Sequence, residues 1–175
     1  MTSLAALRPI LEDDLPTLER FLIDPEEVGP FEWHGFADPG RWRKRWAVNG
    51  LLDDDGGQLL VVSDRDVLGF VAWRKIITAR GSFCWNIGIA LLAEHRGKGH
   101  GTTAQRLLVQ YLFAHTQVAR IEAGTNVANF AEQRALEKVG FTREGVMRSH
   151  AFGGGRWHDT VLYSILRDEA EARYP

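Results

Sequence analysis

Hydrophobic and polar positions along the chain follow two periods, and each period predicts one type of element. Residues 4–10 form a short apolar run that predicts a strand. Apolar positions then recur at helical spacing over 15–22, directly after Asp13 and Asp14, whose side chains suit a helix N-terminus. The basic segment 41–48 predicts a second, short helix. The N-terminal part of the chain is therefore expected to run strand, helix, helix.

In the rest of the chain the apolar positions mostly alternate, which predicts a series of strands. A turn at 63–66 closes the first hairpin of this series. Two intervals show helical spacing instead: one helix follows Gly101, and the other runs over 127–139 and stops at Gly140. We expect strands over 59–62, 67–77, 83–92, 118–123, 141–152 and 157–166.

This order of elements predicts a mixed α/β fold, one domain over residues 1–175 with much antiparallel sheet. The chain of 175 residues and 19.7 kDa can bury roughly 70% of the surface that its unfolded form exposes. It therefore needs no disulfide or metal to fold. No repeat, low-complexity tract or linker divides it.

Composition and charge exclude several classes of protein. Hydrophobic residues make up 45% of the chain and charged residues 25%, which is typical of globular proteins rather than disordered or fibrous ones. The formal net charge of −2 argues against a strong general attraction to nucleic acid. No apolar run reaches the roughly 18 residues of a membrane span, and the N-terminus lacks the pattern of a secretory signal. We expect a cytoplasmic protein.

The chain has one cysteine, Cys84, so no intrachain disulfide or cysteine-based zinc site can form. Cys84 lies in an apolar run, and we expect it to be a small buried residue. His34 and His158 have no third ligand at metal-binding spacing, so we expect no metal.

The most informative segment follows the predicted strand 83–92. Residues 96–101, with the sequence RGKGHG, lie between this strand and a helix. The first N–H groups of a helix have no partner within it, and glycines let a phosphate approach the main chain closely. Arg96 and Lys98 add positive charge. The spacing fits neither a P-loop nor a dinucleotide fingerprint. The segment predicts an anion site, with a glycine-rich turn that binds nothing as the alternative.

Residues 96–101 also resemble the Arg/Gln-x-x-Gly-x-Gly/Ala loop of the GNAT family of N-acetyltransferases. Further motifs of this family follow in order: Asn129, then LEKVGF at 136–141 with Glu144-Gly145, then WHD at 157–159 with Tyr163-Ser164. The opening LRP at 7–9 fits as well. The resemblance covers nearly the whole chain and is strongest to the branch that acetylates the N-terminal alanine or serine of ribosomal proteins. It implies a single α+β domain with a mixed, mostly antiparallel twisted sheet, flanking helices and a splayed strand pair that holds the cofactor.

The resemblance implies acetyl-CoA as co-substrate and assigns residues to it. The main chain of the loop would hold the diphosphate, the end of the preceding strand would pair with the pantetheine amides, and Asn129 would bond the pantetheine arm. A main-chain N–H at Leu91 would stabilise the oxyanion of the tetrahedral intermediate. The cofactor-binding residues expected are Ile89, Ala90, Leu91, Arg96, Gly97, Lys98, Gly99, His100, Gly101, Thr102 and Asn129.

The chain departs from the family pattern at three positions. Leu136 stands where many relatives have a tyrosine that protonates the leaving thiolate, and Glu132 stands where the branch often has serine. Asn86 stands where many relatives have glutamate. An α-amine with a pKa of about 8 needs only a weak base. We name His150 as candidate base and Asn86 as a residue that holds the amine or a water.

The acceptor is less defined. Phe31, Glu32 and Trp33 lie in a loop rich in glycine and proline, and with Trp85 they are the candidate substrate-binding residues. Glu32 would recognise a cationic amine. The leading function is acetyl transfer from acetyl-CoA to a protein N-terminal α-amine or a small-molecule amine, by direct attack in a ternary complex.

Two other functions stay open. The basic run Arg41, Arg43, Lys44 and Arg45 leaves RNA binding open, and with it another acyl donor such as an aminoacyl-tRNA. The departures from the family's catalytic residues leave open a non-catalytic module that binds CoA. The C-terminal hairpin is a candidate for pairing with a second copy as a homodimer.

Overall fold

Eight strands form one sheet in the computed structural model, which describes residues 5–64 and 66–174. Residue 4 of the first predicted strand and Arg65 of the predicted turn lie outside this range. The strands are β1 (Ala6–Arg8), β2 (Leu52–Asp53), β3 (Gly56–Ser63), β4 (Asp66–Ala79), β5 (Ser82–Leu91), β6 (Arg120–Asn126), β7 (Thr142–Gly153) and β8 (Arg156–Leu166). Their order is β1-β3-β4-β5-β6-β8-β7, with β2 paired to β3. Among the strand pairs of the described residues, only β5–β6 is parallel, so the predicted mixed, mostly antiparallel sheet is confirmed.

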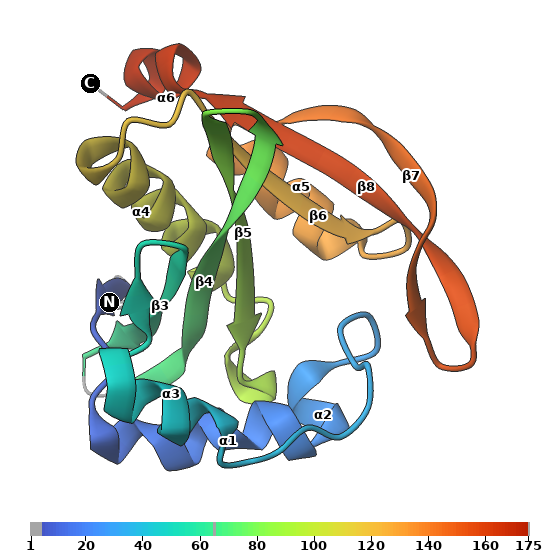
Figure 1. Ribbon diagram of the computed structural model, residues 1–175. Helices are drawn as coiled ribbons and strands as arrows, with labels where there is room; N and C mark the ends of the chain where they lie inside the picture. The colour runs from blue at the N-terminus through green and yellow to red at the C-terminus, as the bar shows by residue number, and fades with distance from the viewer. Residues whose placement is uncertain (1–4, 65, 175) are drawn as a thin grey trace.

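The helices lie around this sheet (Figure 1). They are α1 (Leu15–Ile23), α2 (Pro25–Val28), α3 (Arg41–Asn49), α4 (His100–His115), α5 (Phe130–Val139) and α6 (Arg167–Arg173), with 3₁₀ turns at Glu12–Asp14 and Ala93–His95. Two of them are absent from the sequence prediction. The first, α2, starts where Asp24 accepts a hydrogen bond from the N–H of Glu26 inside the expected loop. The second, α6, packs the apolar side chain of Ala170 into the core after the last strand.

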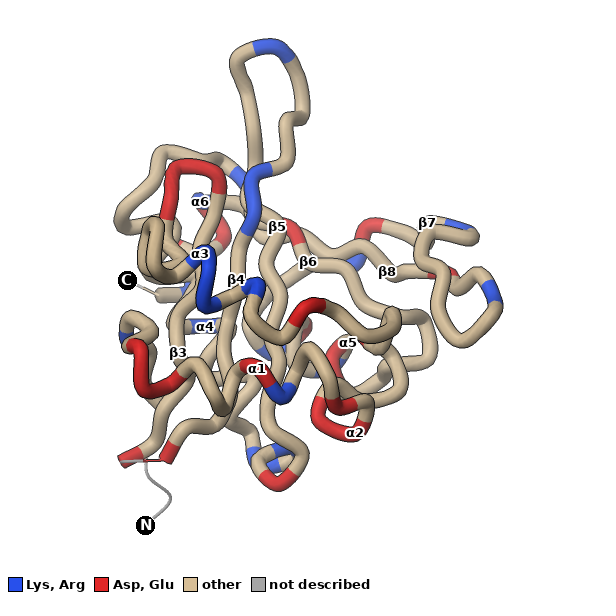
Figure 2. Tube along the Cα trace, turned by 60° about the horizontal axis from the view of Figure 1, so that its bottom comes forward, with Lys and Arg blue, Asp and Glu red and all other residues tan. Residues whose placement is uncertain are grey.

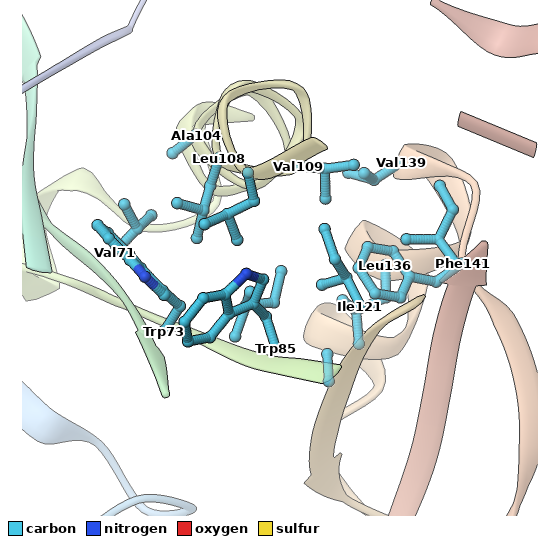
Figure 3. Packing of buried hydrophobic residues seen from close by; sticks show 14 of the residues in the cluster. Val71, Trp73, Trp85, Ala104, Leu108, Val109, Ile121, Leu136, Val139 and Phe141 are labelled. Atoms are coloured by element: carbon cyan, nitrogen blue, oxygen red, sulfur yellow. The ribbon is translucent and has the colours of Figure 1, made fainter. Parts of the chain in front are cut away.

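Alternation along the strands divides the core into two clusters, one on each face of the sheet. On β3, Leu59 and Val61 belong to the cluster under α4 and α5, whereas Leu60 between them belongs to the cluster under α1 and α3. Figure 3 shows the larger cluster, in which Leu108 of α4 lies beside Trp85 of β5. Strand periodicity in the sequence thus determines which helices cover which face.

The parallel pair β5–β6 separates part-way along its length. The last paired residues are Ile87 and Ala123, although β5 continues to Leu91 and β6 to Asn126. On its other edge β5 stays paired with β4 as far as Leu91. The expected splayed strand pair is therefore present.

The hydrogen-bonding pattern shows which main-chain groups of β5 face this gap. The N–H of Leu92 donates to the carbonyl of Leu68 at 2.9 Å, and the register with β4 is continuous from there. In an antiparallel ladder every second residue of a strand hydrogen-bonds to the same neighbour. Counting back from Leu92, Ala90 and Gly88 therefore bond to β4. Ile89 and Leu91 consequently turn their main-chain groups toward the gap.

Candidate active site

The glycine-rich loop lies at the open end of the gap between β5 and β6. Gly97 and Gly99 have φ angles of 71° and 84°, a left-handed conformation that L side chains rarely adopt. Gly99 is the N-cap of α4, and no side chain caps this helix. A Cβ on Gly101 would lie 3.6 Å from Leu91 and 3.8 Å from Ile89, so the first turn of α4 packs directly on β5. The uncapped N–H groups of 97–102 therefore form an anion-binding surface beside the strand.

The side chain of Arg96 has a different role from the one expected. Instead of adding charge for a phosphate, its guanidinium donates to the carbonyl of Leu91 at 2.9 Å and to the carbonyls of Glu26 and Glu27 in α2. The carbonyl groups at the end of that short helix lack helical partners and attract a cation. Arg96 thus ties the end of β5 to the segment that leads into the loop with Phe31.

The gap itself is a narrow slot of about 100 Å³ between the separated strands. Asn129 stands at its wall as the N-cap of α5: its Oδ1 accepts from the N–H of Glu132 at 3.3 Å, and its Nδ2 donates to Thr125 at 3.1 Å. One amide hydrogen of Asn129 is left over for a ligand. The slot is lined by Glu32, Ile87, Gly88, Ile89, Gln105, Ala123, Gly124, Thr125, Asn129 and Glu132.

The slot opens into a larger space that we call the inner cavity, of about 390 Å³. Glu32, Gly124 and Thr125 line both spaces and mark their junction. The expected residues Asn86, His150, Phe31 and Glu32 meet here. The lining consists of Phe31, Glu32, His34, Arg74, Ile76, Asn86, Glu122, Gly124, Thr125, Asn126, Met147, His150, Ala151, Thr160 and Leu162.

An outer cavity of about 570 Å³ continues from the inner one past Phe31, His34 and Ala151, which line both. Trp33 lies on its wall. The loop after α2 contacts the β7–β8 hairpin, where Nδ1 of His34 lies 3.2 Å from the carbonyl oxygen of Phe152. Figure 1 shows the hairpin reaching down toward this loop.

Trp85 does not line any of these spaces, so its assignment to the acceptor site is corrected. Its side chain is 4% exposed, lies in the core under α4, and donates its indole N–H to Thr116 at 3.0 Å. Trp85 and Asn86 are neighbours on a strand and so point to opposite faces of the sheet. Asn86 faces the cavity, and Trp85 faces the core.

Asn86 and His150 both have partners within the inner cavity. Oδ1 of Asn86 accepts from Nε of Arg74 at 3.3 Å, so the amide offers donors to the cavity. Nδ1 of His150 lies 3.2 Å from Oγ1 of Thr160. A bulge in β7 precedes His150: Ser149 has a φ of 48° and donates its N–H to Asp159 at 2.8 Å. Asp159 of β8 thus holds the main chain of β7 at this bulge.

Two carboxyl groups, those of Glu32 and Glu132, line the slot. Glu32 is reached by water through the cavity, but the concave walls remove much of its solvation and raise its pKa. Burial raises the pKa of Glu132 to about 7, against the hydrogen bond that it accepts from Gln105; the charge of Glu32 raises it further. The sequence marked Glu132 only as a departure from the family pattern. Its solvation depends on α4 and on the loop of Glu32, which local sequence does not reveal.

Two other side chains are excluded from the chemistry by their burial. Leu136, at the position of the family's tyrosine, is buried in the core and carries no proton to donate. Cys84 is 1% exposed, and burial, together with the charge of Glu122, raises the pKa of its thiol to about 11. The expectation of a buried Cys84 is confirmed.

The basic run of α3 is largely compensated by nearby acids. The ion pairs are Arg43 with Glu19 at 3.3 Å, Lys44 with Asp38 at 2.8 Å, and Arg45 with Asp53 at 2.9 Å. Figure 2 shows blue on α3 and red segments distributed over the surrounding surface. Such pairing favours a solvated helix face over an RNA-binding surface.

Among residues 5–64 and 66–174, no group of three metal-ligating side chains lies close enough to hold an ion. Within the same residues, no helix is both long enough and apolar enough to cross a bilayer.

Comparisons with known proteins agree with this geometry. The chain is 36% identical over 113 residues to the probable N-acetyltransferase YjcK of Bacillus subtilis (strain 168), a match that covers 65% of the chain and 62% of that relative. It is 24% identical over 152 residues to the ribosomal protein uS5 alanine N-acetyltransferase of Escherichia coli (strain K12), covering 83% and 76% of the two chains. The chain spans less than two thirds of the length of YjcK.

A solved structure shows the same fold. The spermidine N-acetyltransferase of Vibrio cholerae in complex with CoA and spermine superposes with a TM-score of 0.83 at 19% identity, covering 95% of this chain and 98% of that one. The family model described as "Acetyltransferase (GNAT) domain" matches residues 5–142. With its separated strand pair, uncapped glycine loop and Asn129 in the slot, the chain belongs to the GNAT family of acetyl-CoA-dependent N-acetyltransferases.

Proposed function

We propose that this protein transfers the acetyl group of acetyl-CoA to the α-amine of a peptide or protein N-terminus, by direct attack in a ternary complex. One observation carries the proposal: the slot between β5 and β6 opens directly into the inner cavity at Glu32, Gly124 and Thr125. A thioester at the end of the slot and an amine in the inner cavity would meet at this junction. Holding both reactants there supplies much of the rate.

Main-chain groups of β5 would bind the pantetheine arm and polarise the thioester. Ile89 lines the slot, whereas Leu91 lies further toward the glycine loop and lines neither space. We therefore assign the N–H of Ile89, rather than that of Leu91, to the oxyanion. The N–H of Leu91 is left to bond a pantetheine amide, and Ala90, which bonds to β4, contributes no main-chain group.

Acceptor-side roles follow from the lining of the inner cavity. Asn86 offers amide donors that can hold the amine through a water, and His150 is the proposed acceptor of its proton. An α-amine is less basic than a lysine amine by about two pKa units, so a histidine suffices.

A peptide N-terminus fits the site better than a polyamine. The inner and outer cavities continue into one another, which leaves room for several residues of extended chain. Their charges are mixed: Glu32 stands with Arg74 in the inner cavity, and Arg156 lines the outer one. A polycation would require a mainly acidic lining. The similarity to the uS5 alanine N-acetyltransferase supports the same acceptor class.

The test is CoA release from acetyl-CoA with three sets of acceptors: peptides with free N-termini, the same peptides blocked at the N-terminus but containing lysine, and spermidine. We expect activity with the first set only. Activity with spermidine alone would replace the proposed acceptor, and CoA binding without turnover on any amine would indicate a non-catalytic module.

Direct attack is tested separately with Cys84→Ala. Because the thiol is buried and protonated, we expect kcat within about twofold of the wild-type value and no acetylated enzyme in a mass spectrum after mixing with acetyl-CoA alone. Loss of turnover in a folded Cys84→Ala protein would indicate a covalent intermediate.

A further inference from the structure

The proposed function accounts for how the amine loses a proton but leaves the sulfur of CoA without a proton donor. Cleavage of the C–S bond leaves an electron pair on sulfur, and the product thiol needs one proton. Neither Leu136 nor Cys84 can supply it from the core. The inner cavity holds His150 and Asn86 on the amine side of the junction. A donor to the sulfur must instead line the slot.

Within the slot lining, the titratable side chains are Glu132 and Glu32. Glu132 comes from the first turn of α5, directly after Asn129, and lines the slot without lining the inner cavity. Glu32 lines both spaces. Glu132 is therefore the carboxyl group on the cofactor side of the junction.

We propose that Glu132 is a catalytic residue of this enzyme, the acid that protonates the thiolate of CoA as it leaves; this assignment rests on the proposed function. The amine nitrogen forms a bond to the carbonyl carbon, and the C–S bond breaks with its electron pair going to sulfur. The carboxyl proton of Glu132 goes to that sulfur, and the excess proton on nitrogen goes to His150. The products are the N-acetyl amine and CoA as free thiol, and solvent restores both side chains.

The environment of Glu132 keeps a proton available. Gln105, which is 1% exposed, donates Nε2–H to Oε1 of Glu132 at 2.8 Å, and its own Oε1 is buried without a hydrogen-bond partner among the described residues. Rotating the amide by 180° would instead let Gln105 accept from the protonated acid. Gln105 can therefore hydrogen-bond to Glu132 in both its ionised and its protonated form.

Charges around the junction also favour the protonated acid. Glu32 and Glu132 both line the slot, and two carboxylates in one confined site resist ionising together. Burial works in the same direction, and the resulting pKa of about 7 suits an acid that acts near neutral pH. Glu32 is thus a positioning residue, acting through its charge. The other charged or titratable groups of the connected inner cavity are His34, Arg74, Glu122 and His150.

The test uses Glu132→Gln, which keeps a hydrogen-bond acceptor for Gln105 but has no acidic proton. We expect kcat to fall about 10- to 100-fold, at the lower end of the range for general acids because a thiolate leaves readily. The KM for both substrates should stay within about twofold. In the wild type kcat should decline above about pH 7, and this decline should be absent in Glu132→Gln. Glu32→Gln should move the decline to lower pH, since it removes the charge that holds the proton on Glu132.

The control is Glu171→Gln, which makes the same charge change at an exposed side chain of α6. Glu171 lines neither the slot nor the inner or outer cavity. It should behave as wild type. A kcat for Glu132→Gln within twofold of wild type, with the high-pH decline retained, would overturn the proposal.

A second measurement needs no amine. The thiolate of bound CoA absorbs in the ultraviolet, so its titration can be followed directly on the enzyme. If Glu132 lies at the sulfur, its carboxylate raises the pKa of the bound thiol, and Glu132→Gln lowers that pKa by about one unit. Identical titrations in the two proteins would refute contact with the sulfur. A shifted thiol in an enzyme that turns over no amine would instead leave Glu132 at the sulfur and refute the proposed function.

Discussion

At the scale of single residues, two neighbouring acids show how environment assigns roles to identical side chains. Glu27 is buried, pairs with Arg20 and accepts the N–H of Ala93 at 3.1 Å, so its charge is compensated and structural. Glu32, five positions later, lies at the junction of slot and inner cavity, where water reaches it but the concave walls reduce its solvation and raise its pKa. A poorly solvated charge that is paired with an opposite charge stabilises the fold. One that lacks such a partner tends to bind a proton or a ligand.

Asn129 combines a structural and a binding role, and two substitutions separate them. Asn129→Ala removes the N-cap of α5 and should lower the free energy of unfolding by about 1 kcal/mol. Asn129→Ser keeps a capping oxygen and should retain most of this stability. Both remove the amide hydrogen available to pantetheine, so both should weaken CoA binding several-fold. Urea unfolding and calorimetric titration with CoA measure the two effects. Unchanged affinity in the serine variant would show that the amide does not contact the cofactor.

At the scale of elements, the site depends on where strands and helices end. The carbonyl of Leu91, the last residue of β5, accepts from Arg96, and α4 begins at His100 without a capping side chain. The same helix with a serine or aspartate N-cap would satisfy its own N–H groups. The proposed cofactor loop is thus a helix start whose N–H groups remain available to an anion.

The glycine loop allows a matched comparison of two glycines at helix ends. Gly99 and Gly50 have φ angles of 84° and 64°, and a Cβ on either meets nothing within 4 Å. Alanine should therefore cost both variants about 1 kcal/mol of stability through backbone strain alone. Only Gly99→Ala should also weaken CoA binding, by about tenfold or more, since its N–H groups would shift. Equal CoA affinity in the two variants, measured by calorimetry, would contradict the assignment of the loop.

Glu144 of β7 links three neighbouring strands, through an ion pair to β6 and a hydrogen bond to β8. Arg120 of β6 and, to a smaller extent, Ser164 of β8 hydrogen-bond Glu144 of β7 and hold its pKa at about 2. Because this pKa is depressed, the pair stabilises the fold above the unfolded-state pKa of about 4.3 and stops doing so as pH falls toward 2.

Glu144→Gln should accordingly lower the free energy of unfolding by about 0.5–1 kcal/mol near pH 7, a small value because the pair is partly exposed. The difference from wild type should shrink as pH falls from about 4 toward 2, because Glu144 is protonated first in the unfolded chain and only near pH 2 in the folded protein. Urea unfolding at several pH values tests this. A difference that is constant with pH would show that the substitution acts through packing instead.

At the scale of the whole molecule, the proposed cofactor site is the gap where β5 and β6 separate within one sheet. Helices cover both faces, and the two core clusters keep β4 and β5 rigid while β5 and β6 diverge. A ligand that fills the slot would replace the strand pairing that is missing there. Binding should therefore stabilise the entire fold.

We expect CoA at about 100 times its dissociation constant to add about 2.7 kcal/mol to the free energy of unfolding. For a chain of this size that corresponds to a rise of about 5–10 °C in Tm. Pantetheine alone lacks the diphosphate and should shift Tm much less. Differential scanning fluorimetry gives both values. Equal shifts would mean that the glycine loop does not bind the diphosphate.

Much of the fold was determined by the sequence alone, because it rests on local chemistry. Alternating positions predicted the long strands β4, β5, β7 and β8, and the glycine loop predicted the start of α4. Motifs identified the family. The sequence analysis did not predict α2 and α6, which are short. These helices depend on capping and on tertiary contacts, and the spacing of apolar residues reveals neither.

Only the tertiary structure decided which residues meet. It places Trp85 in the core, Asn86 at the inner cavity and the side chain of Arg96 against α2. The lining of the slot also supports our proposal that Ile89, rather than Leu91, donates to the oxyanion. The tertiary structure also brought Glu32 and Glu132, 100 positions apart, to the lining of one slot. The physical reason is that periodicity specifies which face a side chain takes, while desolvation and charge coupling depend on neighbours from distant parts of the chain.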